Sequence, residues 1–199
     1  EDDRYRDYRL IGGRDNRCNY REIHCEIERK MKPKYLVLHH SVSPFGDAKT
    51  IDEWHQERSL HEPWSVADAG DLKFIGYHKC ILNGKRTAKS KYAPTLDGKI
   101  EQGRLDHIVG CHCVGMNSKS LGIVLIGNYD VEERKPKQWD ALIDACARLC
   151  IRHYIPVENI LGHRETPSGK KKKTACPGKN ISMDWVRKFV RIKIKELKQ

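Results

Sequence analysis

The sequence predicts a layered fold of the α/β or α+β class, in which helices cover a β-sheet. Short apolar runs typical of strands are mixed along the chain with longer segments of helical periodicity. The run SLGIVLIGNY at 120–129 is apolar on both faces, which predicts a central strand. Residues 136–154 instead repeat apolar positions at helical spacing, which predicts a helix. A chain of 199 residues suits one domain with a core, or one domain and an extension.

We expect residues 1–33 to be a charged N-terminal extension, because they are dense in charge and lack a periodic apolar pattern. The pattern changes at Lys34, and the domain is expected to span 34–199. The start, EDDRYRDYRL, lacks the basic and then apolar segments of a signal peptide, so none is expected, although a processed chain would look the same. No apolar run approaches the roughly 20 residues of a membrane-spanning helix.

The first half of the domain begins with a predicted strand at 35–40, YLVLHH. A helix is expected at 49–60, with Thr50 as its N-cap and Glu53 completing a capping box. A second strand at 74–82 is followed by NGK, the turn sequence of a hairpin.

Residues 83–98 are polar and rich in turn formers, which predicts an inserted loop before a strand at 99–104. The last helix is expected at 181–199, with Ser182 as its N-cap. One face of this helix is expected to carry its apolar residues, Trp185, Phe189 and Val190.

The net charge of +11 and the pI near 9.3 favour a polyanionic partner, such as nucleic acid, an anionic membrane or an acidic cell-wall polymer. The chain carries no recognition-helix or aromatic-platform signature, so nucleic acid is not expected. Solubility alone is the alternative explanation of the charge.

Eight cysteines are many for a reduced cytosolic protein, but no CxxC pair occurs, which argues against a zinc ribbon or a thioredoxin motif. Cys146 and Cys150 lie one helical turn apart and are expected in the core. Cys18 and Cys25 could pair as a disulfide, which the sequence leaves open.

Three residues are candidates for a metal site: His39 after a strand, His163 in GHRE and Cys176 in ACPG. Neutral imidazole and thiolate are favoured zinc ligands, and three protein ligands leave a fourth position for water. Their distance along the chain does not establish the set, because each residue alone is more often an ordinary strand-end, loop or turn residue.

The surroundings of these residues resemble the zinc-dependent N-acetylmuramoyl-L-alanine amidases of the phage-lysozyme and peptidoglycan recognition protein superfamily. The resemblance covers roughly residues 34–187 and rests on five blocks in the family's order. The blocks are VLHHS (37–41), IDEWH (51–55), IGYH (75–78), VGCHCVGMNSKSLGIVLIGNYD (109–130) and GHRETP…TACPG (162–178). It implies an α/β fold with a central mixed β-sheet flanked by helices.

Position by position, the resemblance implies that His39, His163 and Cys176 hold one catalytic zinc ion. Members that only bind peptidoglycan replace the cysteine, so its presence favours a catalyst. Tyr77 would point its hydroxyl at the reacting oxygen. Thr174 stands where phage members often carry a lysine and where catalytic recognition proteins carry threonine, and its hydroxyl could donate to the same oxygen.

Substrate contacts are expected from His112, Asn117 and Arg104. His40 should point to the opposite side of the strand from His39, because side chains alternate, and is interpreted as structural. Val124 stands where some cytosolic relatives place a glutamate, which argues against that branch and leaves the general base unassigned.

Two further features of these blocks are given an ordinary interpretation. The run from Lys170 to Lys173 is expected to be a solvated loop, with a lysine that reaches the site as the alternative. The triplet CHC at 111–113 looks like a second metal site, but further ligands for it cannot be named.

The reaction implied by the resemblance is hydrolysis of the amide between N-acetylmuramic acid and L-alanine of the stem peptide, as in a phage-type lysin. The alternative is a non-catalytic module that binds peptidoglycan. We expect a monomer that acts on the bacterial cell wall, either released from a host cytoplasm or secreted. Its expected partners are peptidoglycan and an anionic wall polymer or membrane surface, which the basic helix at 181–199 could contact.

Overall fold

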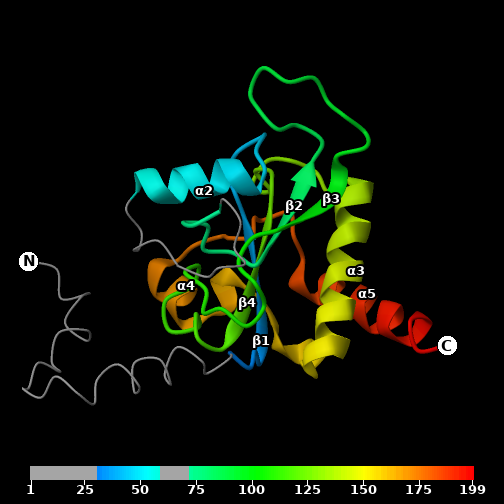
Figure 1. The fold of residues 1–199 in the computed structure, drawn as a ribbon. Helices are drawn as coiled ribbons and strands as arrows, with labels where there is room; N and C mark the ends of the chain where they lie inside the picture. Colours follow the sequence, from blue (N-terminus) through cyan, green and yellow to red (C-terminus); the bar gives the residue numbers. More distant parts are fainter. Residues whose placement is uncertain (1–30, 59–71) are drawn as a thin grey trace, which may run out of the picture. The chain divides into compact units, whose positions relative to one another are not determined.

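The computed structural model describes residues 31–58 and 72–199 and places a five-stranded mixed sheet at the centre of this part of the chain (Figure 1). The strand order is β3-β2-β4-β1-β5. β1 is parallel to both β4 and β5, β2 is parallel to β4, and β3 is antiparallel to β2. The strands are β1 (Tyr35–His40), β2 (Lys79–Asn83), β3 (Asp97–Gln102), β4 (Ser120–Leu125) and β5 (Ile160–Gly162). The predicted α/β fold with a mixed sheet is confirmed.

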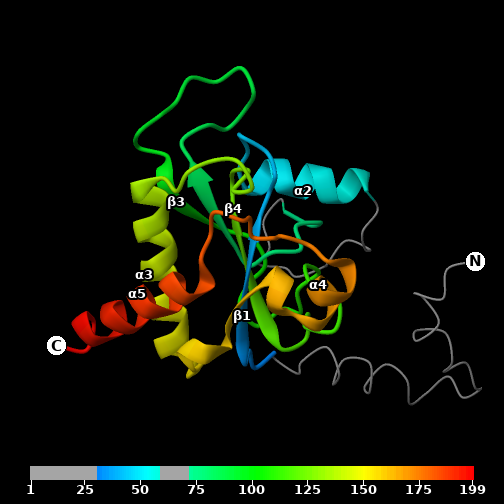
Figure 2. The same ribbon diagram turned by 180° about the vertical axis from the view of Figure 1, so that it is seen from behind.

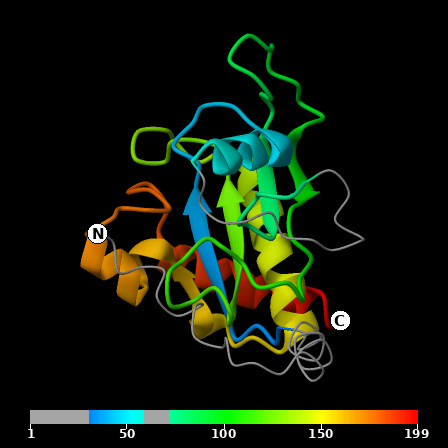
Figure 3. The same cartoon turned by 60° about the vertical axis from the view of Figure 1, so that its left-hand side comes forward.

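Helices lie on both faces of this sheet. They are α2 (Ala48–Glu57), α3 (Pro136–His153), α4 (Pro167–Lys172) and α5 (Met183–Glu196), with short 3-10 turns η2 (Val157–Asn159) and η3 (His163–Glu165). Figures 1 and 2 show α3 and α5 together on one side of the sheet, and Figure 3 shows the same layers from an oblique direction. α2 and α4 lie on the other side.

The two faces of β1 pack in different clusters, which follows from strand alternation. Leu36 and Leu38 belong to the large core cluster that includes residues of α3 and α5. Val37 packs instead with Cys113 and Met116 on the opposite face. His39 alternates with Leu38 and therefore faces away from the α3–α5 layer.

β4 is the central strand, as predicted, and all six of its residues are buried. The strand ends at Leu125, earlier than the predicted 129, because the following backbone donors bind side chains. The N–H of Gly127 donates to Ser41 Oγ at 3.1 Å, and the N–H of Tyr129 donates to His40 Nδ1 at 3.1 Å. His40 thus makes a structural contact on the side of the strand opposite to His39.

Side chains of α2 explain two differences from the sequence-based boundaries. The N-cap is Asp47 and not Thr50, because Asp47 Oδ1 accepts the N–H of Thr50 at 2.8 Å. Residues 74–76 are not in a strand, because Asp52 Oδ1 accepts the N–H of Phe74 (2.6 Å) and of Ile75 (2.7 Å). The backbone N–H groups of these two residues therefore bind a side chain of α2 and not a neighbouring strand, and β2 begins only at Lys79.

The C-terminal helix begins after Ser182, whose Oγ accepts the N–H of Trp185 at 3.4 Å, so the predicted N-cap is confirmed. The prediction of a single apolar face is wrong: Val186 and Val190 are buried, whereas Trp185 and Phe189 are exposed. Each buried valine follows an exposed aromatic residue by one position, so the two pairs lie about 100° apart around the helix.

Three further expectations concern the helical cysteines, the lysine run and the N-terminal extension. Cys146 and Cys150 are buried in the core, as predicted. Lys170–Lys173 are exposed, as predicted, but the first three end α4 and do not form a loop. Most of the expected extension lies outside the described residues, including Cys18 and Cys25, although Met31 is already buried in the core.

None of the helices in residues 31–58 and 72–199 combines the length and the apolar character needed to cross a membrane.

Candidate metal centre

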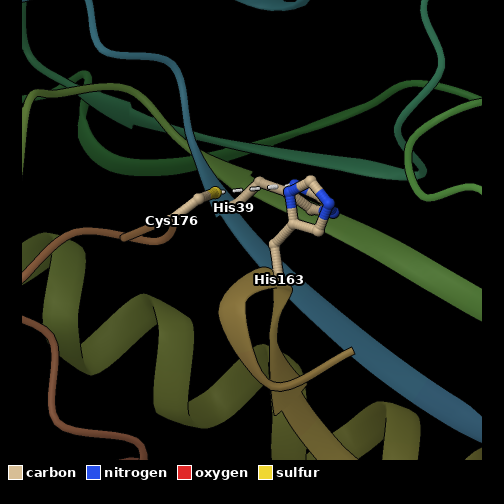
Figure 4. A group of neighbouring side chains, drawn as sticks. All are labelled: His39, His163 and Cys176. Carbon is tan, nitrogen blue, oxygen red and sulfur yellow. Dashed lines mark hydrogen bonds between the residues drawn. The ribbon is translucent and has the colours of Figure 1, made fainter. Parts of the chain in front are cut away.

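His39, His163 and Cys176 converge at one end of the sheet, although they lie far apart in the sequence (Figure 4). One potential ligand atom from each residue lies within 4.8 Å of the other two. His39 Nδ1 is 3.7 Å from the sulfur of Cys176, and the ring centroids of His39 and His163 are 4.8 Å apart. Two imidazoles and a thiol at this separation match the donor set and the spacing that a zinc ion takes in proteins.

The topology of the sheet brings the two histidines together. His39 is near the carboxyl end of β1, and His163 immediately follows β5. These two strands are parallel neighbours, so their carboxyl ends meet at the same edge of the sheet.

Arg164 ties the segment that carries Cys176 to the segment that carries His163. Its backbone N–H donates to the carbonyl of Cys176 at 2.8 Å. Its guanidinium donates to the carbonyls of Ala175 (3.0 Å) and Gly178 (2.8 Å). No pattern in the sequence pointed to Arg164, whose only signal was its place beside His163.

The electrostatics of the cluster keep all three side chains neutral in the absence of metal. Burial lowers the pKa of His39 well below its usual value, and the neighbouring His112 and His163 lower it further. Burial also lowers the pKa of His163, with a smaller contribution from Lys172. Burial raises the pKa of the Cys176 thiol to about 12, so the sulfur is protonated at neutral pH.

Zinc binding is therefore expected to release at least one proton per ion at pH 7, because a thiol must become a thiolate to ligate metal while the two imidazoles are already neutral, and ionisation of a zinc-bound water would add to this count. The apparent association constant should then rise at least tenfold per pH unit between about pH 7 and 9. Calorimetric titrations in two buffers of different ionisation enthalpy measure the proton count. A count near zero would mean that the thiol of the free protein is already ionised.

Tyr77 and Thr174, the predicted catalytic residues, lie beside the cluster. The ring centroid of Tyr77 is 5.1 Å from that of His39. Burial raises the pKa of Tyr77 well above its usual value, so its hydroxyl stays protonated and can donate a hydrogen bond. Thr174 Oγ1 accepts the backbone N–H of Cys176 at 3.2 Å, and its hydroxyl donates no hydrogen bond within residues 31–58 and 72–199.

His112, a predicted substrate contact, is packed directly behind His39. Its Nδ1 lies 3.2 Å from His39 Nε2, and burial lowers its pKa to about 3. Gly122 of β4 provides the space, because a Cβ there would stand 2.6 Å from the His112 ring.

The other two predicted substrate contacts serve the local backbone. Asn117 Oδ1 accepts the N–H groups of His112 (2.9 Å) and Cys113 (2.8 Å). Arg104 is only 5% exposed, and its guanidinium donates to the carbonyls of Ile75 (2.7 Å) and Val109 (2.5 Å). Substrate contact by His112, Asn117 and Arg104 stays a prediction.

Solved structures with a similar fold include amidases and peptidoglycan-recognition proteins. Amidase LysC from Clostridium intestinale URNW, an N-acetylmuramoyl-L-alanine amidase, superposes with a TM-score of 0.62 at 25% identity, covering 81% of this chain and 87% of that one. A structure of Drosophila PGRP-LB, a tyrosine-to-phenylalanine mutant in complex with tracheal cytotoxin, gives a TM-score of 0.55 at 26% identity over 77% of this chain and 80% of that one.

Residues 29–179 match the family model of N-acetylmuramoyl-L-alanine amidase, and the chain belongs to this family. Peptidoglycan-recognition protein SC2 of Drosophila melanogaster is 37% identical over 154 residues, which are 74% of this chain and 69% of that protein. Peptidoglycan-recognition protein LB of the same species is 28% identical over 72% of this chain, and the match spans only 54% of its length.

Proposed function

We propose that this protein is a zinc-dependent amidase that cleaves the bond between N-acetylmuramic acid and L-alanine of peptidoglycan. The observation that carries the proposal is the convergence of His39, His163 and Cys176 beside the ring of Tyr77, whose hydroxyl is protonated. A metal site alone would serve binding, whereas a site with an adjacent proton donor has a means of stabilising developing negative charge. Family membership supports the amide as the bond attacked.

The three clustered side chains would hold one zinc ion, which when bound polarises a carbonyl and makes water nucleophilic at neutral pH. Tyr77 would donate its proton in a hydrogen bond to the carbonyl oxygen of the scissile amide as that oxygen gains charge. Thr174 would donate to the same oxygen while its lone pair receives the Cys176 N–H. Val124 is fully buried among apolar side chains. A valine side chain cannot accept a proton, so another group must act as the general base.

A non-catalytic peptidoglycan receptor is the second candidate, because the two Drosophila relatives described above are named peptidoglycan-recognition proteins. The two functions differ in an assay of purified protein on peptidoglycan. An amidase releases free amino termini of L-alanine and stops when the metal is chelated, whereas a receptor sediments with the wall and leaves it intact. Sedimentation without released amino termini, in the presence of added zinc, would overturn the amidase proposal.

Peptidoglycan is thus the proposed partner of the domain from residue 34 to 199, with residues 1–33 as a charged extension. The net charge of +11 would draw the protein to the anionic bacterial wall, as suits a lytic enzyme. Whether it reaches the wall as a phage-type lysin or as a secreted protein makes no difference to this chemistry.

Replacing Tyr77 by phenylalanine is expected to keep zinc bound but to lower kcat by about a hundredfold, because one donor to the developing oxyanion is lost. The Michaelis constant should change little, since the ground-state carbonyl carries less charge. Metal analysis and steady-state kinetics on a soluble muropeptide measure both quantities. Tyr92→Phe in the β2–β3 loop removes a hydroxyl that donates to Asp97 at the start of β3, and this variant is the matched control. An unchanged kcat in Tyr77→Phe would remove this residue from the mechanism.

A further inference from the structure

Helix α5 carries a second apolar stripe that faces solvent. Trp185, Phe189 and Ile192 are 51%, 36% and 43% exposed, respectively. Their spacing of four and three residues places them on one side of the helix. The residues buried against the core, Val186 and Val190, lie about 100° further around the helix. A surface helix normally has one apolar side, so a second exposed one indicates a contact with something outside the described fold.

The stripe continues onto the start of α3 as an aromatic cluster. The ring of Phe189 is 6.0 Å from that of Trp185 and 6.2 Å from that of Trp139. The guanidinium of Arg134 lies over both indoles, 4.8 Å from Trp139 and 4.9 Å from Trp185. These cation–π contacts hold the rings in place at the surface.

Cations without a carboxylate partner border the same stripe. Lys188 and Lys195 are exposed, follow Trp185 by three and ten residues, and form no ion pair with the described residues. The other basic residues of the helix are paired within the fold. These pairs are Arg187 with Glu165 and Asp184, Arg191 with Glu158, and Lys193 with Glu196. The unpaired positive charge of α5 therefore lies beside the exposed aromatic rings.

We propose that this surface, formed by Trp139, Trp185, Lys188, Phe189, Ile192 and Lys195, docks on an anionic lipid membrane. A soluble polyanion would pair with the two lysines but would leave the indole and phenyl rings in water. A lipid surface satisfies both, because aromatic rings insert at headgroup level while ammonium groups contact lipid phosphates. The high net charge adds long-range attraction to such a surface.

The position of the surface suits this role. It belongs to the α3–α5 layer, whereas His39 faces the opposite layer with Val37. A docked molecule would thus turn the α3–α5 side of its sheet toward the membrane, and the side that His39 faces would point away from it. The inference does not depend on amidase activity.

Binding of the full chain to vesicles tests the proposal. Vesicles of phosphatidylglycerol and phosphatidylcholine should sediment the protein and shift its tryptophan emission to the blue, and vesicles of phosphatidylcholine alone should do neither. Lys188→Gln with Lys195→Gln should weaken binding about thirtyfold, at about fivefold per lysine. Lys170→Gln with Lys171→Gln on α4 removes the same charge from exposed positions elsewhere and should change binding less than threefold.

The aromatic half of the surface is tested by Trp185→Gln with Phe189→Gln, which should reduce the blue shift to the part that comes from Trp139 and weaken binding at least tenfold. Equal binding by this variant and the parent would overturn the proposal, as would equal losses in the α3–α5 and α4 lysine pairs. Binding of a soluble teichoic acid that displaces the vesicles without needing Trp185 would also overturn it and identify a polymer site. Cys176→Ser should keep its vesicle binding, so a failure of the amidase proposal and a failure of this one are distinguishable.

Discussion

Replacing Cys176 by serine is expected to remove zinc from the protein and to lower amide hydrolysis about a thousandfold or more. A serine hydroxyl is a poor zinc ligand because it does not ionise near neutral pH, and two imidazoles alone hold the metal weakly. Metal polarisation of the carbonyl and activation of water together account for several kcal/mol of transition-state stabilisation, which would be lost with the ion. Metal analysis after gel filtration and release of L-alanine amino termini from peptidoglycan measure the two effects.

The fold should survive this change. The backbone around Cys176 is held by the donors of Arg164 and by the N–H bond to Thr174, none of which involves the sulfur. Near-native circular dichroism is therefore expected for the variant. Cys111→Ser is the matched control, because Cys111 is half-buried and outside the His–His–Cys cluster, and it should keep both zinc and activity. Full activity in Cys176→Ser would mean that another residue completes the ligand set.

Sequence reasoning succeeded where the determining interactions are local or have a simple period. β4 was identifiable because a run apolar on both faces fits only a buried central strand. The start of α5 was identifiable because Ser182 caps it within one turn. The ligand set, in contrast, was proposed through the resemblance of ordered blocks, since no local pattern connects His39 with Cys176.

The structure differs from the sequence-based predictions where side chains that are distant in the sequence accept hydrogen bonds from backbone N–H groups. Asp52 captures the N–H groups of residues 74 and 75, so an apolar run that has the composition of a strand does not form one. The packing of His112 behind His39 depends on the space that Gly122 leaves for its ring, which the chain alone does not show, and its contact with substrate stays a prediction. The lysine run of α4 favoured the prediction of a solvated loop there. Thr166 as N-cap and Pro167 at the first position are the sequence signal for the helix.

Replacing Gly169 by alanine is expected to destabilise the fold by about 3 kcal/mol, against the direction that helix propensity predicts. Gly169 lies inside α4, where alanine would ordinarily stabilise by about 1 kcal/mol. Here the added Cβ would stand 1.8 Å from the carbonyl oxygen of His163, which is backbone and cannot rotate away. α4 would have to move off the turn that carries His163, at the cost typical of overpacking a rigid site.

The same displacement should weaken zinc binding by about ten- to a hundredfold, the range typical when groups that orient metal ligands are disturbed. The carbonyl of Gly169 accepts the N–H of Thr174, two residues before Cys176, so a shift of α4 would move both ligand-bearing segments. Urea unfolding and zinc titration measure the two effects, with Lys170→Ala, an exposed substitution in the same helix, as the control within about 0.5 kcal/mol of the parent. A Gly169→Ala protein that is more stable than the parent would show that helix propensity decides at this position and that α4 does not press on His163.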